Sequence, residues 1–310
     1  MIFFKEIKAL GTEIEVYLQD EPKKDFASDF AELEKVIVDF EQSFSRFLDN
    51  SEINHLNQSA NIFSASDEMI KILLLAKNYY QETEGIFDPT ILQSLEDLGY
   101  KKSFPFNEPG DANHDQSEIN FQKIIINENE KIISKPNNLK IDLGGIGKGF
   151  LVDKLVNIIR AKEYKNFWVS AGGDMYLYGL AENNEPHQIG IQNPLDLEKD
   201  IIHVQVPEKG LAIATSGIAK RQWIKNGRSY HHLIDPRTGL STDNNLLAVT
   251  IVANTVIEAD IFAKTVFILG QEQGLSFINE YNGIEGLLIN KGNKIIPSQN
   301  MSDYLIKGYK

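Results

Sequence analysis

The chain has 310 residues, of which 42% are hydrophobic and 10% aromatic, and this is enough to bury one large core or two coupled ones. A formal net charge of -13 without any basic run argues against duplex nucleic acid and anionic membrane surfaces as partners. The absence of cysteine excludes disulfides, cysteine-zinc sites and thiol catalysis.

The N-terminus carries no recognisable targeting segment. Its apolar part is too short for a secretory signal, and Lys5 follows it too soon. No apolar stretch elsewhere reaches the length of a membrane span. The sequence as written therefore predicts cytoplasmic residence, and export only if it is a trimmed mature form.

Two periodic patterns begin the chain. Residues 13–18 alternate between polar and apolar side chains, which predicts a half-buried strand. Over residues 26–44 apolar side chains recur at steps of three and four, which predicts a helix with one face in the core. This stripe consists of Phe26, Phe30, Leu33, Ile37, Phe40 and Phe44.

A second helix is predicted next. Ser64, followed three residues later by Asp67, marks its start, and Gly85 marks its end. Residues 101–120 are polar and contain several prolines and glycines, which predicts a solvent-exposed loop or insertion.

Strand-like runs dominate the rest of the chain. Strands do not alternate strictly with helices and no internal repeat is visible, so the predicted class is α+β rather than doubly wound α/β. The predicted strands cover residues 123–126, 131–134, 167–170, 188–192, 201–206 and 247–253, and the predicted helices lie near 148–162 and 257–269.

The most informative segment is a glycine-rich turn at residues 140–150. An apolar run ends in four glycines and continues as a helix, so bare backbone and a helix N-terminus are presented together, as a pyrophosphate requires. Gly149 follows Lys148 where a P-loop needs Ser or Thr, and the glycines do not have Rossmann spacing. Taken alone, the segment fits a phosphate site and tight strand-to-helix packing about equally.

Several other segments combine turn glycines or aromatic residues with polar groups. With these residues the chain resembles the ApbE family of FAD:protein FMN transferases, from residue 9 to Gly270. The resemblance implies a T-fold-like α+β architecture, in which residues 1–310 form one compact unit with two coupled subdomains and a ligand cleft between them. The segments are residues 9–12, 45–57, 85–90, 170–174, 215–217 and 232–239.

The resemblance also implies a set of FAD contacts. Phe47 stands where an aromatic ring lies against the flavin, and Leu10 stands where relatives usually have methionine. The implied contacts are Leu10, Phe47, Ile86, Phe87, Asp88, Asp142, Lys148 and Ile234.

Some of these residues have plainer explanations in the sequence itself. Asp88 and Asp235 precede prolines and could simply initiate turns. Asp142 ends an apolar run, so its carboxylate should find backbone N–H donors or a ligand hydroxyl. His232, which precedes Ile234 and Asp235, could hold its loop or move a proton.

A magnesium site is implied at Gly145 and at a late helix that contains Asp260. The family's second helical ligand is a threonine four residues after the aspartate, but this chain has Lys264 there. Thr265, the next residue, lies about 100° further around a helix than Lys264 and is a possible substitute for the threonine ligand. Either Lys264 points away and water completes the metal shell, or its ammonium occupies the place of the cation.

The implied activity is magnesium-dependent transfer of FMN from FAD to a threonine or serine hydroxyl of a partner flavoprotein, with release of AMP. Lys148 and the turn amides would spread the developing charge, and His232 or Asp235 would accept the proton. Because Lys264 replaces the threonine, the alternative is a FAD-binding protein or FAD pyrophosphatase with weakened or absent transfer. A second alternative is an interaction module that does not bind flavin.

Overall fold

The computed structural model describes residues 1–20, 24–102, 118–225 and 227–306. The chain divides into two compact units, which we call unit 1 (residues 1–38, 148–219 and 245–310) and unit 2 (residues 39–147 and 220–244). An antiparallel sheet and several helices make up the fold without strand-helix-strand alternation, which confirms the predicted α+β class.

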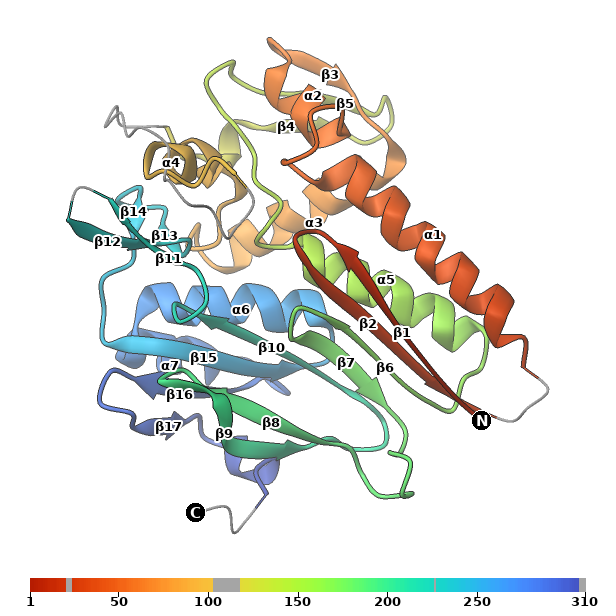
Figure 1. Ribbon diagram of the computed structural model, residues 1–310. Helices are drawn as coiled ribbons and strands as arrows, with labels where there is room; N and C mark the ends of the chain where they lie inside the picture. The colour runs from red at the N-terminus through yellow and green to blue at the C-terminus, as the bar shows by residue number, and fades with distance from the viewer. Residues whose placement is uncertain (21–23, 103–117, 226, 307–310) are drawn as a thin grey trace. The chain divides into compact units, whose positions relative to one another are not determined.

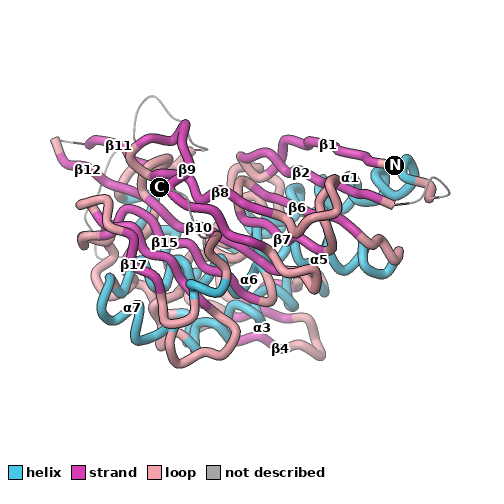
Figure 2. The backbone as a smooth tube through the Cα atoms, turned by 90° about the horizontal axis from the view of Figure 1, so that it is seen from below, coloured by secondary structure: helices cyan, strands magenta, loops and turns pink. Residues whose placement is uncertain are grey.

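Unit 1 is built on an eight-stranded sheet in which every neighbouring pair is antiparallel. Figure 2 shows most of these strands side by side. The strand predicted at residues 13–18 is β2. In sheet order, the strands are β1 (Ile2–Ala9), β2 (Thr12–Gln19), β6 (Asn166–Ala171), β7 (Asp174–Tyr178), β10 (Leu211–Gly217), β15 (Leu246–Ala253), β16 (Glu285–Asn290) and β17 (Ile295–Pro297).

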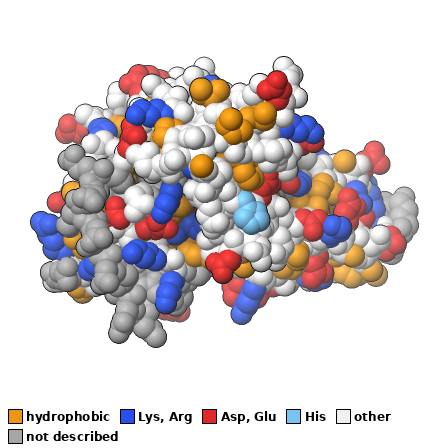
Figure 3. All heavy atoms as spheres, turned by 90° about the horizontal axis from the view of Figure 1, so that it is seen from above, with side chains coloured by type: hydrophobic (Ala, Val, Ile, Leu, Met, Phe, Trp, Pro, Cys, Tyr) orange, Lys and Arg blue, Asp and Glu red, His pale blue; other side chains and the backbone are white. Residues whose placement is uncertain are grey.

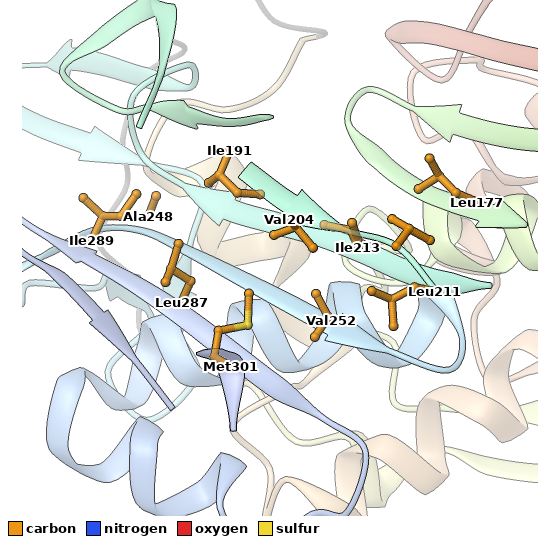
Figure 4. Packing of buried hydrophobic residues seen from close by; sticks show 11 residues of the cluster. Leu177, Ile191, Val204, Leu211, Ile213, Ala248, Val252, Leu287, Ile289 and Met301 are labelled. Carbon is orange, nitrogen blue, oxygen red and sulfur yellow. The ribbon is translucent and has the colours of Figure 1, made fainter. Parts of the chain in front are cut away.

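One face of this sheet is covered by the hairpin of β8 (Gln188–Asn193) and β9 (Asp196–Gln205). Ile191 and Val204 of the hairpin pack against Ile213, Val252 and Leu287 of the sheet (Figure 4). Alternate residues of each strand point to the same face, so these side chains form one continuous apolar layer.

Helices pack on the sheet as well. Helix α6 (Val256–Leu269) lies against β10 and β15, and α7 (Gln271–Ile278) lies against α6 and β16 (Figure 1). Helix α5 (Gly147–Ala161) joins them, because its Asp153 accepts hydrogen bonds from the N–H groups of Val256 and Ile257 at the start of α6, at 2.9 and 3.0 Å.

Helix α6 is buried on nearly all sides. Its start is fixed by Thr255, whose hydroxyl accepts the N–H of Glu258 at 3.3 Å, and its end by Gly270 with φ 80. Because a helix that is apolar all round belongs in a core, the carboxylate of Asp260, 1% exposed, is out of place there and needs a partner.

Helix α1 (Phe26–Phe44) confirms the predicted helix at residues 26–44, and all six residues of its stripe are buried. The periodicity was sufficient because a long amphipathic stripe has only one way to bury itself.

Unit 2 consists of short helices and three small sheets. Its aromatic cluster contains Tyr100 and Trp223, and the Trp223 indole N–H donates to the Leu98 carbonyl at 2.8 Å. The elements are α2 (Glu52–Gln58), α3 (Asp67–Glu82) and α4 (Leu92–Asp97), the sheet of β3 (Ile62–Ser64), β5 (Ile132–Ser134) and β4 (Ile125–Asn127), and the hairpins β11 (Gln222–Lys225) with β12 (Arg228–His231) and β13 (Ile234–Asp235) with β14 (Leu240–Ser241). Single 3₁₀ turns lie at Pro89–Ile91 and Phe121–Lys123, and one in unit 1 at Met301–Asp303.

One predicted boundary was wrong. Helix α3 is capped by Ser66 rather than Ser64, since the Ser66 hydroxyl accepts the N–H of Met69 at 3.1 Å. Ser64 instead ends strand β3, and a single-residue cap offers too little information to choose between two nearby serines. The sequence also did not predict the helices α2, α4 and α7 or the strands β1, β3, β7, β10, β11, β12, β13, β14, β16 and β17.

The predicted polar loop at residues 101–120 falls mostly on residues 103–117, which lie outside the described residues. Within the described ranges, none of the helices combines the length and apolar character needed to cross a bilayer. On the face drawn in Figure 3, the described Lys and Arg side chains are scattered among acidic and apolar ones.

Candidate functional site

Within unit 2, Asp142 holds the glycine-rich turn in place. This carboxylate accepts the N–H of Gly144 and lies 3.0 Å from Nε of Arg46. Of the two predicted kinds of partner, backbone N–H donors or a ligand hydroxyl, the structure shows a backbone N–H, that of Gly144, while Arg46 was not foreseen as a partner. Gly145, next in the turn, is half-buried, and Gly147 begins helix α5.

Arg46 has an unusually complete environment. Its guanidinium lies over the rings of Phe47 and Tyr100, 4.3 and 4.7 Å from their centroids, and donates to the Tyr100 carbonyl at 3.1 Å. Cation–π contacts, an ion pair and hydrogen bonds together compensate for burying this charge. Phe47, predicted to lie against the flavin, is 36% exposed and so presents ring surface backed by a cation.

The asparagines of the segment at residues 45–57 fix this arrangement. Asn57 accepts the N–H and donates to the carbonyl of Ile141, both at 2.8 Å, and so imitates a neighbouring strand. Asn54 donates to the carbonyls of Arg46 and Leu48 at 2.9 Å. Because both side-chain amides bond to backbone groups, they position the Phe47 loop and the segment that leads to Asp142.

Asp88 is a structural centre of the segment at residues 85–90. Its carboxylate is buried and accepts the N–H and hydroxyl of Thr90, at 2.7 and 2.6 Å, and the N–H of Phe121 at 3.2 Å. Desolvation raises the pKa of Asp88, and these hydrogen bonds oppose the shift. The side chain thus serves the turn that the sequence suggested, and a FAD contact of this segment would use backbone.

Three further predicted contacts have buried side chains. Ile86 and Phe87 are less than a tenth exposed, and Ile234 packs in the cluster with Tyr100 and Trp223. Their side chains shape the fold of unit 2.

The adjacent histidines His231 and His232 have different environments. His231 is buried, and its Nε2 lies 2.8 Å from the carbonyl of Thr242. His232 is half-buried. Asp235 is engaged by Arg237, whose N–H and guanidinium donate to both carboxylate oxygens at 2.7 to 2.9 Å, and its own carbonyl accepts from Gly239 at 2.8 Å. Asp235 therefore organises its turn, in keeping with its place before a proline.

In unit 1, Lys148 forms an ion pair with the buried carboxylate of Asp174. Asp174 also accepts the N–H of Thr215 at 3.3 Å. Gly149, the next residue, lies so close to α6 that a Cβ there would be 2.7 Å from Cα of Ile257. At Gly149, therefore, the packing explanation of the glycine holds, and it places the first turn of α5 on the first turn of α6.

Leu10 lies at the tip of the hairpin between β1 and β2. Leu10 and Gly11 both have positive φ, 54 and 67, as a two-residue type I′ turn requires. The Thr12 hydroxyl would be 2.3 Å from a Cβ on Gly172, so the turn before Asp174 accommodates this hairpin only because Gly172 has no side chain.

The predicted metal residues of unit 1 lie on α6. The Lys264 ammonium is paired with Oδ1 of Asp260 and also donates to the Asp260 carbonyl at 3.3 Å. The sequence left two alternatives for Lys264, and the structure agrees with the second. The ammonium pairs with the Asp260 carboxylate and does not point into solvent. The Thr265 hydroxyl donates to the Ile261 carbonyl at 2.9 Å, which opposes its use as a substitute ligand.

These residues do not fit a magnesium ion. The second oxygen of Asp260 is buried and has no hydrogen-bond partner in the part of the chain that the structure describes, but a divalent ion bound there would lie within roughly 5 Å of the ammonium. At about 4 Å, charges of +2 and +1 repel by about 8 kcal/mol at an effective dielectric constant of about 20. Over the described residues, no group of three or more His, Asp and Glu side chains is placed so that it could hold a metal ion.

The chain matches the ApbE family over residues 10–288. It is 25% identical over 304 residues to the FAD:protein FMN transferase of Haemophilus influenzae, covering 94% of this chain and 88% of that protein. It is 26% identical over 310 residues to the enzyme of the same name from Vibrio cholerae, covering 96% and 91%.

Solved structures show the same fold. The ApbE protein of Thermotoga maritima superposes with a TM-score of 0.88 at 23% identity, covering 99% of this chain and 100% of that one. The flavin transferase ApbE of Vibrio cholerae gives a TM-score of 0.84 at 24% identity, covering 98% and 99%. The chain belongs to the ApbE family.

Proposed function

We propose that this protein transfers FMN from FAD to a threonine or serine hydroxyl of a partner flavoprotein and releases AMP. The relatives named FAD:protein FMN transferase match this chain over nearly its whole length, and this supports the reaction class. The observation in the structure that favours it most is the fixed turn at residues 142–149, where Asp142 and Lys148 are each held by a buried partner of opposite charge.

In this proposal, the turn and the start of α5 receive the pyrophosphate. N–H groups at a helix N-terminus stabilise phosphate charge, and Lys148 adds a positive charge there. Asp174 fixes the direction of the Lys148 side chain, so little reorganisation is needed as charge grows on the phosphate oxygens. Phe47, backed by Arg46, offers its exposed ring to the flavin.

The acceptor hydroxyl attacks the phosphorus on the riboflavin side of FAD. A new phosphoester bond forms, the bond from that phosphorus to the bridging oxygen breaks, and AMP leaves with the bridging oxygen. We assign acceptance of the hydroxyl proton to His232, since both carboxylate oxygens of Asp235 are already occupied by Arg237. If water attacks instead, the products are FMN and AMP.

No step of this proposal passes through magnesium, since the residues on α6 do not fit the ion.

The test is to incubate the purified protein with FAD and a candidate acceptor flavoprotein, then to measure AMP by chromatography and the acceptor mass by mass spectrometry. A gain of one FMN moiety on a threonine or serine, with an equal amount of AMP, supports the proposal. Release of AMP and FMN without labelling of the acceptor would favour a FAD pyrophosphatase. If FAD binds but no AMP is released, whichever divalent metal is added, a flavin-binding protein would be favoured.

A further inference from the structure

We propose that the Lys264 ammonium is a built-in cation that replaces a divalent metal at Asp260, so that this protein binds and cleaves FAD without added metal. The inference rests on the proposed function and identifies a further residue for the same reaction.

The Asp260–Lys264 pair lies near the start of helix α5. Ile257, Asp260 and Lys264 are spaced by three and four residues, so they share one face of α6. On that face the Ile257 backbone lies against Gly149, in the first turn of the helix to which Lys148 belongs. With a rise of about 1.5 Å per residue, the Asp260–Lys264 pair begins about one helical turn from this contact. The ion pair is therefore close to the segment proposed to hold the pyrophosphate.

Two buried carboxylates of unit 1 already have counter-charges. Asp260 and Asp174 are both buried in unit 1, and each carboxylate is neutralised by a lysine of the same unit, Lys264 and Lys148. A resident divalent cation is normally held by carboxylates that have no other counter-charge. In this protein the counter-charge is already covalently attached to the chain.

The Lys264 ammonium also has hydrogen-bonding capacity left for a ligand. The Lys264 side chain is 15% exposed and makes its two described hydrogen bonds with Asp260 alone, which leaves an ammonium N–H for an incoming oxygen. Oδ1 of Asp260 holds the ammonium, while the second oxygen of this carboxylate is buried and has no hydrogen-bond partner among the described residues. A phosphate oxygen of FAD is the ligand chemistry that suits this arrangement.

The experiment compares the wild-type protein with Lys264→Thr, which removes the ammonium and introduces a hydroxyl, and Lys264→Met, which removes the charge and keeps the length. Circular dichroism and thermal unfolding first establish that each variant is folded. Each protein is then tested for Mn²⁺ binding by electron paramagnetic resonance with FAD present, and for AMP release from FAD in EDTA and in magnesium.

We expect wild-type AMP release to be the same in EDTA and in magnesium, and no tight Mn²⁺ signal. Lys264→Met should lose AMP release in both conditions by about two orders of magnitude, the usual effect of losing one electrostatic group. Lys264→Thr should bind Mn²⁺ and release AMP only with metal. A wild type that binds Mn²⁺ tightly or stops in EDTA would overturn the inference, as would Lys264→Met with full activity.

Failure of the proposed function gives a different result. If no protein releases AMP under any condition, the transferase and pyrophosphatase activities are refuted, while Mn²⁺ binding still decides the inference. Absence of Mn²⁺ from the wild type and its presence in Lys264→Thr would support Lys264 as the substitute cation, and Mn²⁺ in both would reject it.

Discussion

Nε of Arg46 lies 3.0 Å from Oδ2 of Asp142, and both side chains are 9% exposed, so a buried ion pair joins the Phe47 loop to the glycine-rich turn. The pair explains how two segments far apart in the sequence are held together within unit 2. It also means that Asp142 has a structural task beside any contact with FAD.

The first prediction separates these two tasks with a double-mutant cycle. Asp142→Leu should lower the free energy of unfolding by about 3 kcal/mol because it leaves Arg46 buried and without its counter-charge. The double variant Arg46→Met/Asp142→Leu should lower the free energy of unfolding by less than that, because it leaves no unpaired charge. Urea unfolding measures the stabilities, and calorimetry measures FAD affinity. If FAD binding recovers together with stability in the double variant, Asp142 does not contact the ligand.

The second prediction concerns the choice between FAD and FMN. FAD should bind more tightly than FMN, because only FAD has the pyrophosphate that the turn and Lys148 can use. Lys148→Met should weaken FAD binding by about tenfold and FMN binding less, as expected for one charge-assisted contact of about 1.4 kcal/mol. Calorimetry with both ligands checks this. Equal affinities for FAD and FMN in the wild type would contradict the site at residues 142–149.

The third prediction distinguishes the two candidate proton acceptors. His232→Gln should lower AMP release by about two to four orders of magnitude, the usual contribution of a general base. Asp235→Asn should mainly lower stability, because it weakens the bidentate contact with Arg237. Thermal unfolding and AMP release are measured for both. A silent His232→Gln with an inactive but stable Asp235→Asn would reverse the assignment.

The sequence predicted those parts of the fold that repeat a local pattern. The stripe from Phe26 to Phe44 and the alternation around Val16 each require only neighbours in the chain, and both were confirmed as α1 and β2. Asp142 was expected to find backbone N–H donors or a ligand hydroxyl because an unpaired carboxylate at the end of an apolar run is costly, and the Gly144 N–H is such a donor.

Long-range pairing was not predictable in the same way. Nothing near Arg46 in the sequence indicates Asp142, and nothing near Lys148 indicates Asp174, since each pair depends on how distant segments pack. The Lys264 pair was an intermediate case. Spacing by four residues on a helix allowed contact with Asp260, but only burial of the helix decided that the ammonium stays on the carboxylate.

The fourth prediction is a pH dependence that arises from Asp153. Desolvation raises the pKa of this carboxyl from 3.8 to about 6, although the N–H groups of Val256 and Ile257 donate to it. The folded state therefore binds the proton more tightly than the unfolded state, so the stability from this group is fully present below about pH 3.8 and is lost as pH rises through about 6. The full difference corresponds to about 3 kcal/mol.

Asp153→Asn isolates this contribution because it keeps the shape and cannot titrate. The wild type should lose about 2.4 kcal/mol of stability relative to the variant between about pH 4 and pH 7.5, most of it below about pH 6.5. Urea unfolding of both proteins across this range gives the difference directly. Asp88, whose pKa is also raised, titrates in both proteins and so cancels. A difference that stays constant with pH would show that Asp153 remains charged without cost, and that the two N–H groups at the start of α6 compensate fully for its burial.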